Sequence, residues 1–188
     1  MRSLIVSEFV TLDGVMEAPG GEPTHPHTNW VGDHPGGTSG HFDYKLEEIL
    51  AAEILLLGRV TYESFAGAWP DREGEFAVKL NGMRKVVVSG TLKDPDWNNT
   101  TVLRGDLVAG VSELKAGDGG PILVHGSQTL VHGLLDNNLV DELRLMVFPV
   151  TIGAGGRVFS DTIKKTPWVL ADSIAFASKV RVDVHHPA

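Results

Sequence analysis

The stretch LLLGRVTYESF, residues 55–65, decides the fold class that we expect for this chain. An apolar run typical of a buried strand stops at Gly58, and Arg59 and Thr61 follow at once at the start of an amphipathic stretch. A buried strand that leads directly into a helix is typical of α/β proteins, in which ligands bind at the carboxyl ends of the strands. We therefore expect a ligand site at this point of the chain.

Apolar segments alternate with stretches of helical period along the rest of the sequence. We expect strands at residues 3–10, 52–58, 84–90, 100–105, 121–126, 140–150, 168–177 and 179–186. Helices are expected to begin near Phe42, at Arg59, after a capping Asp106 and after a capping Ser127. This order predicts an α/β fold of three layers, with a mostly parallel central sheet covered by helices on both faces. The last two strands follow each other without a helix, which predicts a C-terminal antiparallel hairpin.

The first expected helix has Phe42, Leu46, Ile49 and Leu50 on one side. Because these four residues recur at helical spacing, we expect that side to face the core.

Composition limits the classes of protein to which the chain can belong. Its 188 residues suit one domain, residues 1–188, and 42% are hydrophobic. A formal net charge of −8 argues against a general nucleic-acid partner. The absence of cysteine excludes disulfides, thiol catalysis and cysteine-ligated zinc, and it fits a cytoplasmic protein. The N-terminal apolar run is too short for a signal peptide, and no stretch approaches the length that would span a membrane.

Glycines and hydroxyl residues follow three of the expected strands. The residues concerned are Gly58, Arg59 and Thr61, then Ser89 and Gly90, then Gly126, Ser127 and Thr129. Helix N-termini at such strand ends favour anions, so together they predict a site for a dinucleotide, with an arginine suited to the 2′-phosphate of NADP. Each residue taken alone has a simpler interpretation as a strand end or a helix cap. The usual G-x-G-x-x-G fingerprint is absent.

Several segments in order resemble one known family. They are SEFVTLDGVME (7–17), LLLGRVTYESF, KVVVSGTL (85–92) and the long run from Ile122 to Phe159. This sequence resembles the dihydrofolate-reductase-like family, in the branch that contains the C-terminal reductase domain of the riboflavin-biosynthesis enzyme RibD. Its HGSQTL segment (125–130) is similar to the family's second phosphate loop, although Ser127 stands where a second glycine is usual. The cysteine-containing deaminase motifs that often precede this domain are missing.

The resemblance implies an enzyme that transfers hydride from NADPH to a flat heterocyclic small molecule. The substrate would be of pteridine or ribosylaminopyrimidine type, as in 5-amino-6-(5-phosphoribosylamino)uracil reductase of riboflavin biosynthesis. It also implies a homodimer, which is the commonest oligomer in any case. The alternative is a non-catalytic nucleotide-binding protein of the same fold.

Two acids are the candidate catalytic residues. Asp13 belongs to the LDG turn that is expected beside the nicotinamide, and Asp43 opens the first helix. Either could donate the proton that accompanies hydride transfer. The simpler interpretations are a turn aspartate for Asp13 and a favourable first-turn acid for Asp43. Glu17 is a weaker candidate of the same kind.

The segment from Met16 to Gly40 is rich in glycine, proline and histidine and has no period. A long loop of this kind is usually functional or disordered, and we expect it to be mobile and to form one wall of the substrate site. His25, His27, His34 and His41 raise the alternative of a metal site. Their spacing matches no ligand motif, so we expect no metal.

Overall fold

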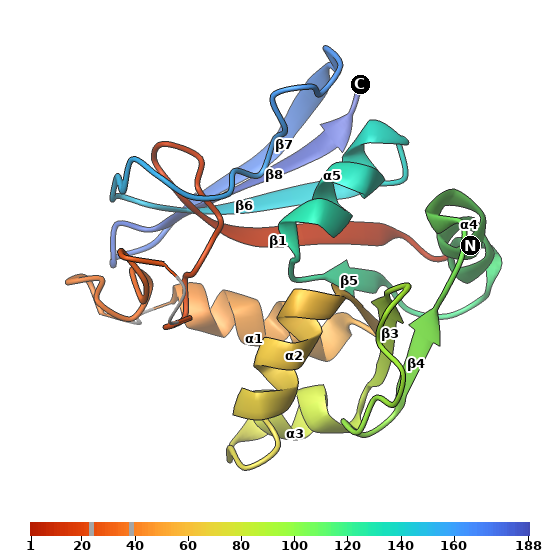
Figure 1. Ribbon diagram of the computed structural model, residues 1–188. Helices are drawn as coiled ribbons and strands as arrows, with labels where there is room; N and C mark the ends of the chain where they lie inside the picture. The colour runs from red at the N-terminus through yellow and green to blue at the C-terminus, as the bar shows by residue number, and fades with distance from the viewer. Residues whose placement is uncertain (23–24, 38–39) are drawn as a thin grey trace.

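The structure is a computed structural model that describes residues 1–22, 25–37 and 40–188 (Figure 1). Eight strands form one sheet in the order β4-β3-β2-β5-β1-β6-β8-β7. The strands are β1 Leu4–Thr11, β2 Ile54–Gly58, β3 Arg84–Val88, β4 Thr100–Leu103, β5 Ile122–Val124, β6 Glu142–Phe148, β7 Trp168–Ala175 and β8 Arg181–Pro187. The helices are α1 His41–Ala51, α2 Arg59–Ala68, α3 Glu75–Gly82, α4 Leu107–Ala116 and α5 Gln128–Asp136.

The six strands β4, β3, β2, β5, β1 and β6 run parallel to one another. Only β8 runs against its two neighbours, β6 and β7. The predicted α/β sheet with an antiparallel C-terminal hairpin is therefore confirmed. Within the described chain, no helix is long and apolar enough to cross a membrane.

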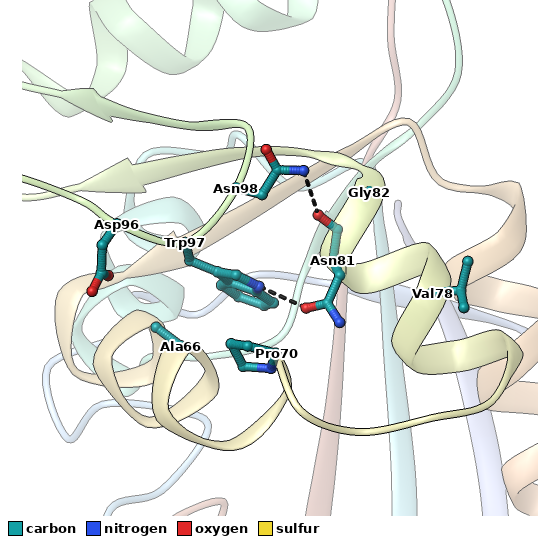
Figure 2. A pocket seen from close by; sticks show the side chains of 8 residues that line it. All are labelled: Ala66, Pro70, Val78, Asn81, Gly82, Asp96, Trp97 and Asn98. Carbon is teal, nitrogen blue, oxygen red and sulfur yellow. Dashed lines mark hydrogen bonds between the residues drawn. The ribbon is translucent and has the colours of Figure 1, made fainter.

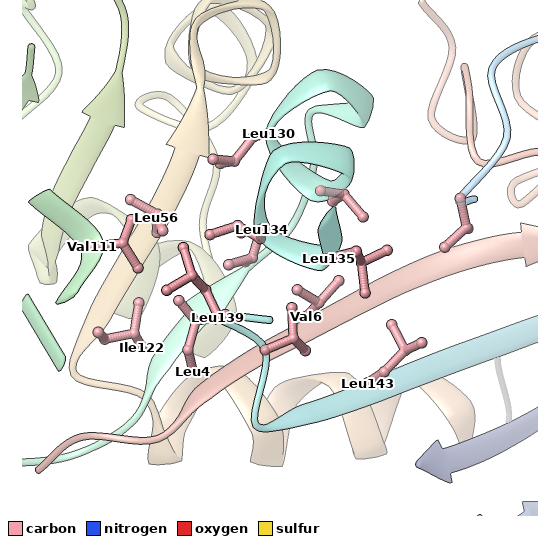
Figure 3. Close-up of a cluster of buried hydrophobic side chains, with 14 of the residues drawn as sticks. Leu4, Val6, Leu56, Val111, Ile122, Leu130, Leu134, Leu135, Leu139 and Leu143 are labelled. Atoms are coloured by element: carbon pink, nitrogen blue, oxygen red, sulfur yellow. The ribbon is translucent and has the colours of Figure 1, made fainter. Parts of the chain in front are cut away.

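Alternate side chains of each central strand pack on opposite faces of the sheet. On one face, Leu4 and Val6 of β1 join a buried cluster with Val111 of α4 and Leu134 of α5 (Figure 3). On the other face, Ile5 of β1 packs in a second cluster that includes side chains from α1, α2 and α3. This alternation follows from the period of two in a strand, and it yields the predicted three layers.

The first helix does not face the core in the expected way. Its buried residues are His41, Lys45, Glu48 and Ile49, whereas Phe42 and Leu50 are exposed by 37% and 39%. The predicted apolar side is therefore wrong for these two residues. The physical reason is that Lys45 and Glu48 find partners on the neighbouring strands, as described below.

Sheet order brings the predicted strand ends together. β2 lies between β3 and β5, and all three run parallel, so their carboxyl ends meet at one edge of the sheet. β1 lies on the other side of β5. The segments that follow β2, β3 and β5 are the three that the sequence predicted as a phosphate site, and the fold makes them neighbours.

Candidate functional site

The turns after β2 and β5 touch each other closely. A Cβ atom added to Gly58 would lie 2.1 Å from Oγ of Ser127, and one added to Gly126 would lie 2.8 Å from Oγ1 of Thr61. Gly126 also has a positive φ of 70°, which side-chain-bearing residues rarely adopt. A side chain at Gly126 would be strained by its φ, and one at Gly58 would have to displace the hydroxyl of Ser127. Four predicted residues thus converge at one point of the sheet edge.

Two helices begin at this contact without a side-chain cap. Gly58 is the N-cap residue of α2, and Ser127 is that of α5. Ser127 occupies the predicted capping position, but its side chain makes no cap hydrogen bond. The first N–H groups of both helices, together with the positive ends of their dipoles, therefore point toward the same place. This arrangement suits an anionic ligand.

Arg59 and Thr129 are exposed residues in the first turns of α2 and α5. Arg59 forms an ion pair with Glu63 one turn later in α2, with its Nη1 donating to the two carboxylate oxygens at 3.0 and 2.9 Å. Both side chains are about half exposed, so the guanidinium is held only by a surface pair. Thr129 is exposed in the first turn of α5.

The turn after β3 is stabilised by the side chain of its own Ser89. Oγ of Ser89 accepts hydrogen bonds from the backbone N–H groups of Thr91 and Leu92 at 3.1 and 2.9 Å, so its hydroxyl oxygen holds the turn itself. Gly90 is exposed, and a Cβ there would meet no atom within 4 Å. Among the three predicted turns, those after β2 and β5 are in contact, while the third lies beside them at the end of β3.

Asp13 serves as the anchor of a turn. Its carboxylate accepts hydrogen bonds from Oγ1 of Thr11 at 2.6 Å and from the N–H of Gly153 at 2.8 Å, which ties the turn after β1 to the glycine-rich turn after β6. The hydrogen bond from Thr11 is the main cause that lowers the pKa of Asp13. A lowered pKa makes a carboxyl group a poorer proton donor at neutral pH. The geometry favours the simpler interpretation of Asp13.

Asp43 is exposed in the first turn of α1. It is on a different element from Asp13, and the acid that α1 buries is Glu48 instead. The assignment of Asp13 or Asp43 as proton donor stays a prediction.

A buried group of charged residues, which the sequence did not reveal, lies between α1 and the sheet. The Glu48 carboxylate is its centre, with Nζ of Lys45 at 2.9 Å, Nε2 of His125 at 3.2 Å and Nη1 of Arg144 at 3.1 Å. Lys45 also donates to the hydroxyl of Ser7 on β1. Lys45 and Glu48 are 3% and 5% exposed. We call these five residues the Glu48 network.

Burial alone would raise the pKa of Glu48, but the charge of Lys45 and the hydrogen bond with His125 outweigh it and hold this pKa well below its usual range. Burial and the nearby Lys45 lower the pKa of His125, so its imidazole is neutral near pH 7. His125 directly precedes Gly126 and its side chain is 11% exposed. The Glu48 network therefore holds an oriented, neutral imidazole beside the candidate phosphate turn.

A second buried acid contacts that turn from β1. Oε1 of Glu8 accepts the N–H of Gly126 at 2.6 Å, and burial raises the pKa of Glu8 to about 8. The sequence carries a signal for it, because Glu8 follows Leu4 and Val6 on the inward side of an apolar strand. Acidic side chains are rarely buried unless they are paired, so an acid at an inward position of a strand indicates a specific role.

The predicted loop from Met16 to Gly40 is partly packed against the sheet. Trp30 is buried against Phe148 of β6, and its ring N–H donates to the carbonyl of Glu17 at 2.9 Å. A hollow of about 450 Å³ lies between residues 26–35 and residues 149–152, which follow β6. Residues 23–24 and 38–39 of this loop lie outside the described residues.

Two histidines of the loop, His25 and His34, contact backbone carbonyls. Nε2 of His25 lies 3.1 Å from the carbonyl of Ala154, and Nε2 of His34 lies 2.7 Å from that of Ser178. In the part of the chain that the structure describes, no three His, Asp or Glu side chains gather as a metal site would need.

A larger hollow of about 700 Å³ lies away from this edge (Figure 2). It is lined by Asn81 and Gly82, which come shortly before β3, and by Trp97 and Asn98, which come shortly before β4. Because these residues precede their strands, the hollow lies toward the amino ends of β3 and β4, opposite to the candidate site. The indole N–H of Trp97 donates to Oδ1 of Asn81 at 2.7 Å across it. We assign it no part in the site.

Solved structures define the class to which this fold belongs. A putative riboflavin biosynthesis protein from Shewanella sp. PV-4 superposes with a TM-score of 0.76 at 19% identity, over 100% of this chain and 99% of that one. Dihydrofolate reductase from Enterococcus faecalis, in a complex with NADP(H), superposes with a TM-score of 0.62 at 13% identity, over 98% and 96%. Likeness at this identity shows the fold alone, and the fold is that of dihydrofolate reductase.

Sequence comparison then gives the family. Residues 2–182 match the RibD C-terminal domain family, and the chain belongs to it. The uncharacterized protein YyaP of Bacillus subtilis is 28% identical over 98% of this chain and 95% of its own length. A diaminohydroxyphosphoribosylaminopyrimidine deaminase/5-amino-6-(5-phosphoribosylamino)uracil reductase from Thermotoga maritima superposes with a TM-score of 0.68 at 16% identity, over 100% of this chain and 57% of that one.

Proposed function

We propose that this protein is an NADPH-dependent reductase of a flat heterocyclic substrate of pteridine or ribosylaminopyrimidine type. One observation carries the proposal: the uncapped N-termini of α2 and α5 meet at Gly58 and Ser127, at the carboxyl ends of adjacent parallel strands. Membership of the RibD C-terminal domain family supports it. So does the fold shared with a dihydrofolate reductase whose structure contains NADP(H).

In this proposal the cofactor's pyrophosphate binds where the two helices begin. The donors would be the first N–H groups of α2 and α5 and the hydroxyls of Thr61, Ser127 and Thr129. The N–H of Gly126 is already donated to Glu8, so Gly126 contributes close approach of its backbone rather than a hydrogen bond. Arg59 would turn from Glu63 to the 2′-phosphate, because a charge-assisted pair with a phosphate is stronger than an exposed pair with a carboxylate.

Ser89 and Gly90 complete the proposed cofactor site at the end of β3. Ser89 keeps the turn in shape, and the open surface over Gly90 leaves room for the adenosine part of the cofactor.

NADPH, when bound, supplies the hydride, and the substrate must gain a proton as well. Asp13 and Asp43 stay as proposed proton donors from the sequence, and we propose that His125 orients the substrate. The ionised carboxylate of Glu48 accepts the Nε2–H of this neutral ring, so the remaining Nδ1 can accept one hydrogen bond at a set position. The hollow between residues 26–35 and 149–152 would take part of the heterocycle, with the predicted mobile loop as its wall.

Calorimetric titration with NADPH, followed by measurement of nicotinamide absorbance with candidate pyrimidine and pteridine acceptors, tests the function. We expect saturable binding and acceptor-dependent oxidation. Binding without oxidation by any acceptor of these classes would favour the non-catalytic nucleotide-binding alternative. A folded protein that binds no NADPH would contradict the whole proposal.

We also propose that the protein acts as a homodimer, and that it works in the cytoplasm. β7 forms one edge of the sheet, and its Val169 and Leu170 are 53% and 56% exposed. An open strand edge with exposed apolar side chains is a usual place for association. Light scattering at micromolar concentration should give about twice the chain mass of 20.2 kDa, and a mass near 20.2 kDa would contradict the dimer.

A further inference from the structure

The carboxyl group of Glu8 is hydrogen-bonded to the turn that precedes α5. Glu8 is 7% exposed, and its Oε1 accepts the N–H of Gly126 in a buried hydrogen bond of 2.6 Å. The proposed function does not use this acid, and nothing in the strand itself requires an acid there, since Leu4, Val6 and Val10 on the same side are apolar. An acid at this position costs stability unless it has a specific partner.

That hydrogen bond fixes the orientation of the turn. Gly126 has a positive φ, its Cα lies against Thr61, and its N–H points down to Glu8. With this peptide unit held, the N–H groups that follow it at the start of α5 keep one direction. Glu8 thus acts on the candidate phosphate site through Gly126 and does not need to touch a ligand.

We propose that Glu8 is a positioning residue for the cofactor's pyrophosphate, and that cofactor binding is coupled to its protonation, with the neutral carboxyl group favouring the bound state. This proposal rests on the proposed function, since it takes the dinucleotide phosphate to be the ligand. The chemical reason is that an ionised Glu8 would place a negative charge under an anion, whereas a neutral Glu8 still accepts the N–H of Gly126.

The charges around Glu8 come from several elements. Burial raises its pKa to about 8, the Gly126 hydrogen bond and Lys45 of α1 oppose this, and Glu48 of α1 adds to it. His125 next to the turn and Arg144 of β6 belong to the Glu48 network and are paired with that acid. The first turn of α5 contains no acidic residue. Glu8 is therefore mostly neutral at pH 7 and ionises as the pH rises through about 8.

The direction of the effect follows from linkage. A bound pyrophosphate adds negative charge near Glu8 and raises its pKa further, so the complex holds the proton more tightly than the free protein does. The dissociation constant should stay level below about pH 7 and rise above the pKa of the free protein. If the pKa differs by about one unit between the two states, the total rise is roughly tenfold.

The experiment measures the dissociation constants of NADPH and NADH by calorimetry between pH 6.5 and 9.5. NADH is included because it has the pyrophosphate but lacks the 2′-phosphate. We expect wild type to lose affinity for both cofactors by about tenfold over this interval. Glu8→Gln keeps an oxygen acceptor for Gly126 but cannot ionise, so its two constants should change less than twofold. Glu47→Gln removes an exposed carboxylate from α1 and should follow wild type.

A Glu8→Gln variant whose dissociation constants depend on pH as those of wild type do would overturn the proposal. So would wild-type dissociation constants that do not change with pH. If wild type binds NADPH normally and its affinity does not change with pH, only the Glu8 proposal fails. If it binds no NADPH at any pH, the proposed function fails and the Glu8 proposal with it.

Should Glu8→Gln not fold, carboxyl carbon NMR of wild type decides instead. The Glu8 signal should titrate near pH 8 and shift to higher pH with NADPH, and an unchanged titration would refute the coupling.

Discussion

Replacement of Glu48 by glutamine is the sharpest test of the buried Glu48 network. Glu48 is 5% exposed, and its two carboxylate oxygens receive Lys45, His125 and Arg144 within 3.2 Å. An amide keeps the size of the side chain but removes its charge. The ammonium group of Lys45, 3% exposed, then stays buried without its anionic partner. Removal of one member of a buried ion pair typically costs about 3–5 kcal/mol, because the remaining charge is left uncompensated.

Urea denaturation at pH 7 measures this loss in the free energy of unfolding. For a chain of this length, one kcal/mol lowers the melting temperature by roughly 2–4 °C, so the melting temperature should fall by roughly 6–20 °C. Glu47→Gln is the matched control, since Glu47 is the adjacent exposed acid on α1 and its loss should change stability by at most about 0.5 kcal/mol. The double variant Glu48→Gln with Lys45→Met removes both charges and should recover much of the loss.

A loss below about 1 kcal/mol for Glu48→Gln would refute the reasoning, because it would mean that water or another group compensates Lys45. A double variant as unstable as the sum of the two single variants would refute it as well, because independent effects would show that the two side chains do not interact.

Three further predictions concern the candidate phosphate site. The ordinary pKa of Glu8 is 4.5 and its pKa in the folded protein is about 8, so between these pH values the folded protein keeps a proton that the unfolded chain releases, and wild-type stability falls as the pH rises. Urea denaturation should therefore show that the free energy of unfolding of Glu8→Gln gains on the order of 3–4 kcal/mol over that of wild type from pH 5 to pH 8. A difference that stays constant with pH would contradict the raised pKa. Arg59→Ala should weaken NADPH roughly tenfold to a hundredfold in calorimetry and leave NADH nearly unchanged, whereas equal losses would separate Arg59 from the 2′-phosphate. Ser127→Ala should weaken NADPH several-fold with little change in melting temperature, because Ser127 makes no cap bond; unchanged affinity would remove its hydroxyl from the site.

Much of the sheet could be predicted because its strands are apolar, and because β2 ends at a glycine and a glycine follows β3, β4 and β5 two residues after each strand ends. The ends of β2, β3 and β5 were selected from residue type alone, and the parallel order of the sheet made them neighbours. The helix α3, Glu75–Gly82, was not predicted. It has eight residues and buries only two side chains, Ala77 and Leu80, which is too short a pattern for a helical period to be recognised.

The Glu48 network could not be predicted for a different reason. Lys45 and Glu48 are three residues apart on a helix, and an acid and a lysine at that spacing are usually an exposed ion pair. The apolar side with Phe42 and Leu50 seemed the better core face, but those residues are exposed. The tertiary contacts of α1 with Ser7, His125 and Arg144 give the pair its partners, and a helix period contains no information about such contacts.

An acidic chain could bind the proposed anionic cofactor because of the kind of group that would bind each phosphate. The chain has a formal net charge of −8, but the contact of α2 with α5 offers backbone N–H groups and helix dipoles, which do not depend on net charge. Glu8, an acid that contacts this turn, is mostly neutral at pH 7 because burial raises its pKa to about 8. The pyrophosphate, common to both nicotinamide cofactors, would thus be held by the backbone, and the 2′-phosphate by the side chain of Arg59. In this proposal affinity and cofactor preference would depend on different chemical groups, and substitutions should separate them.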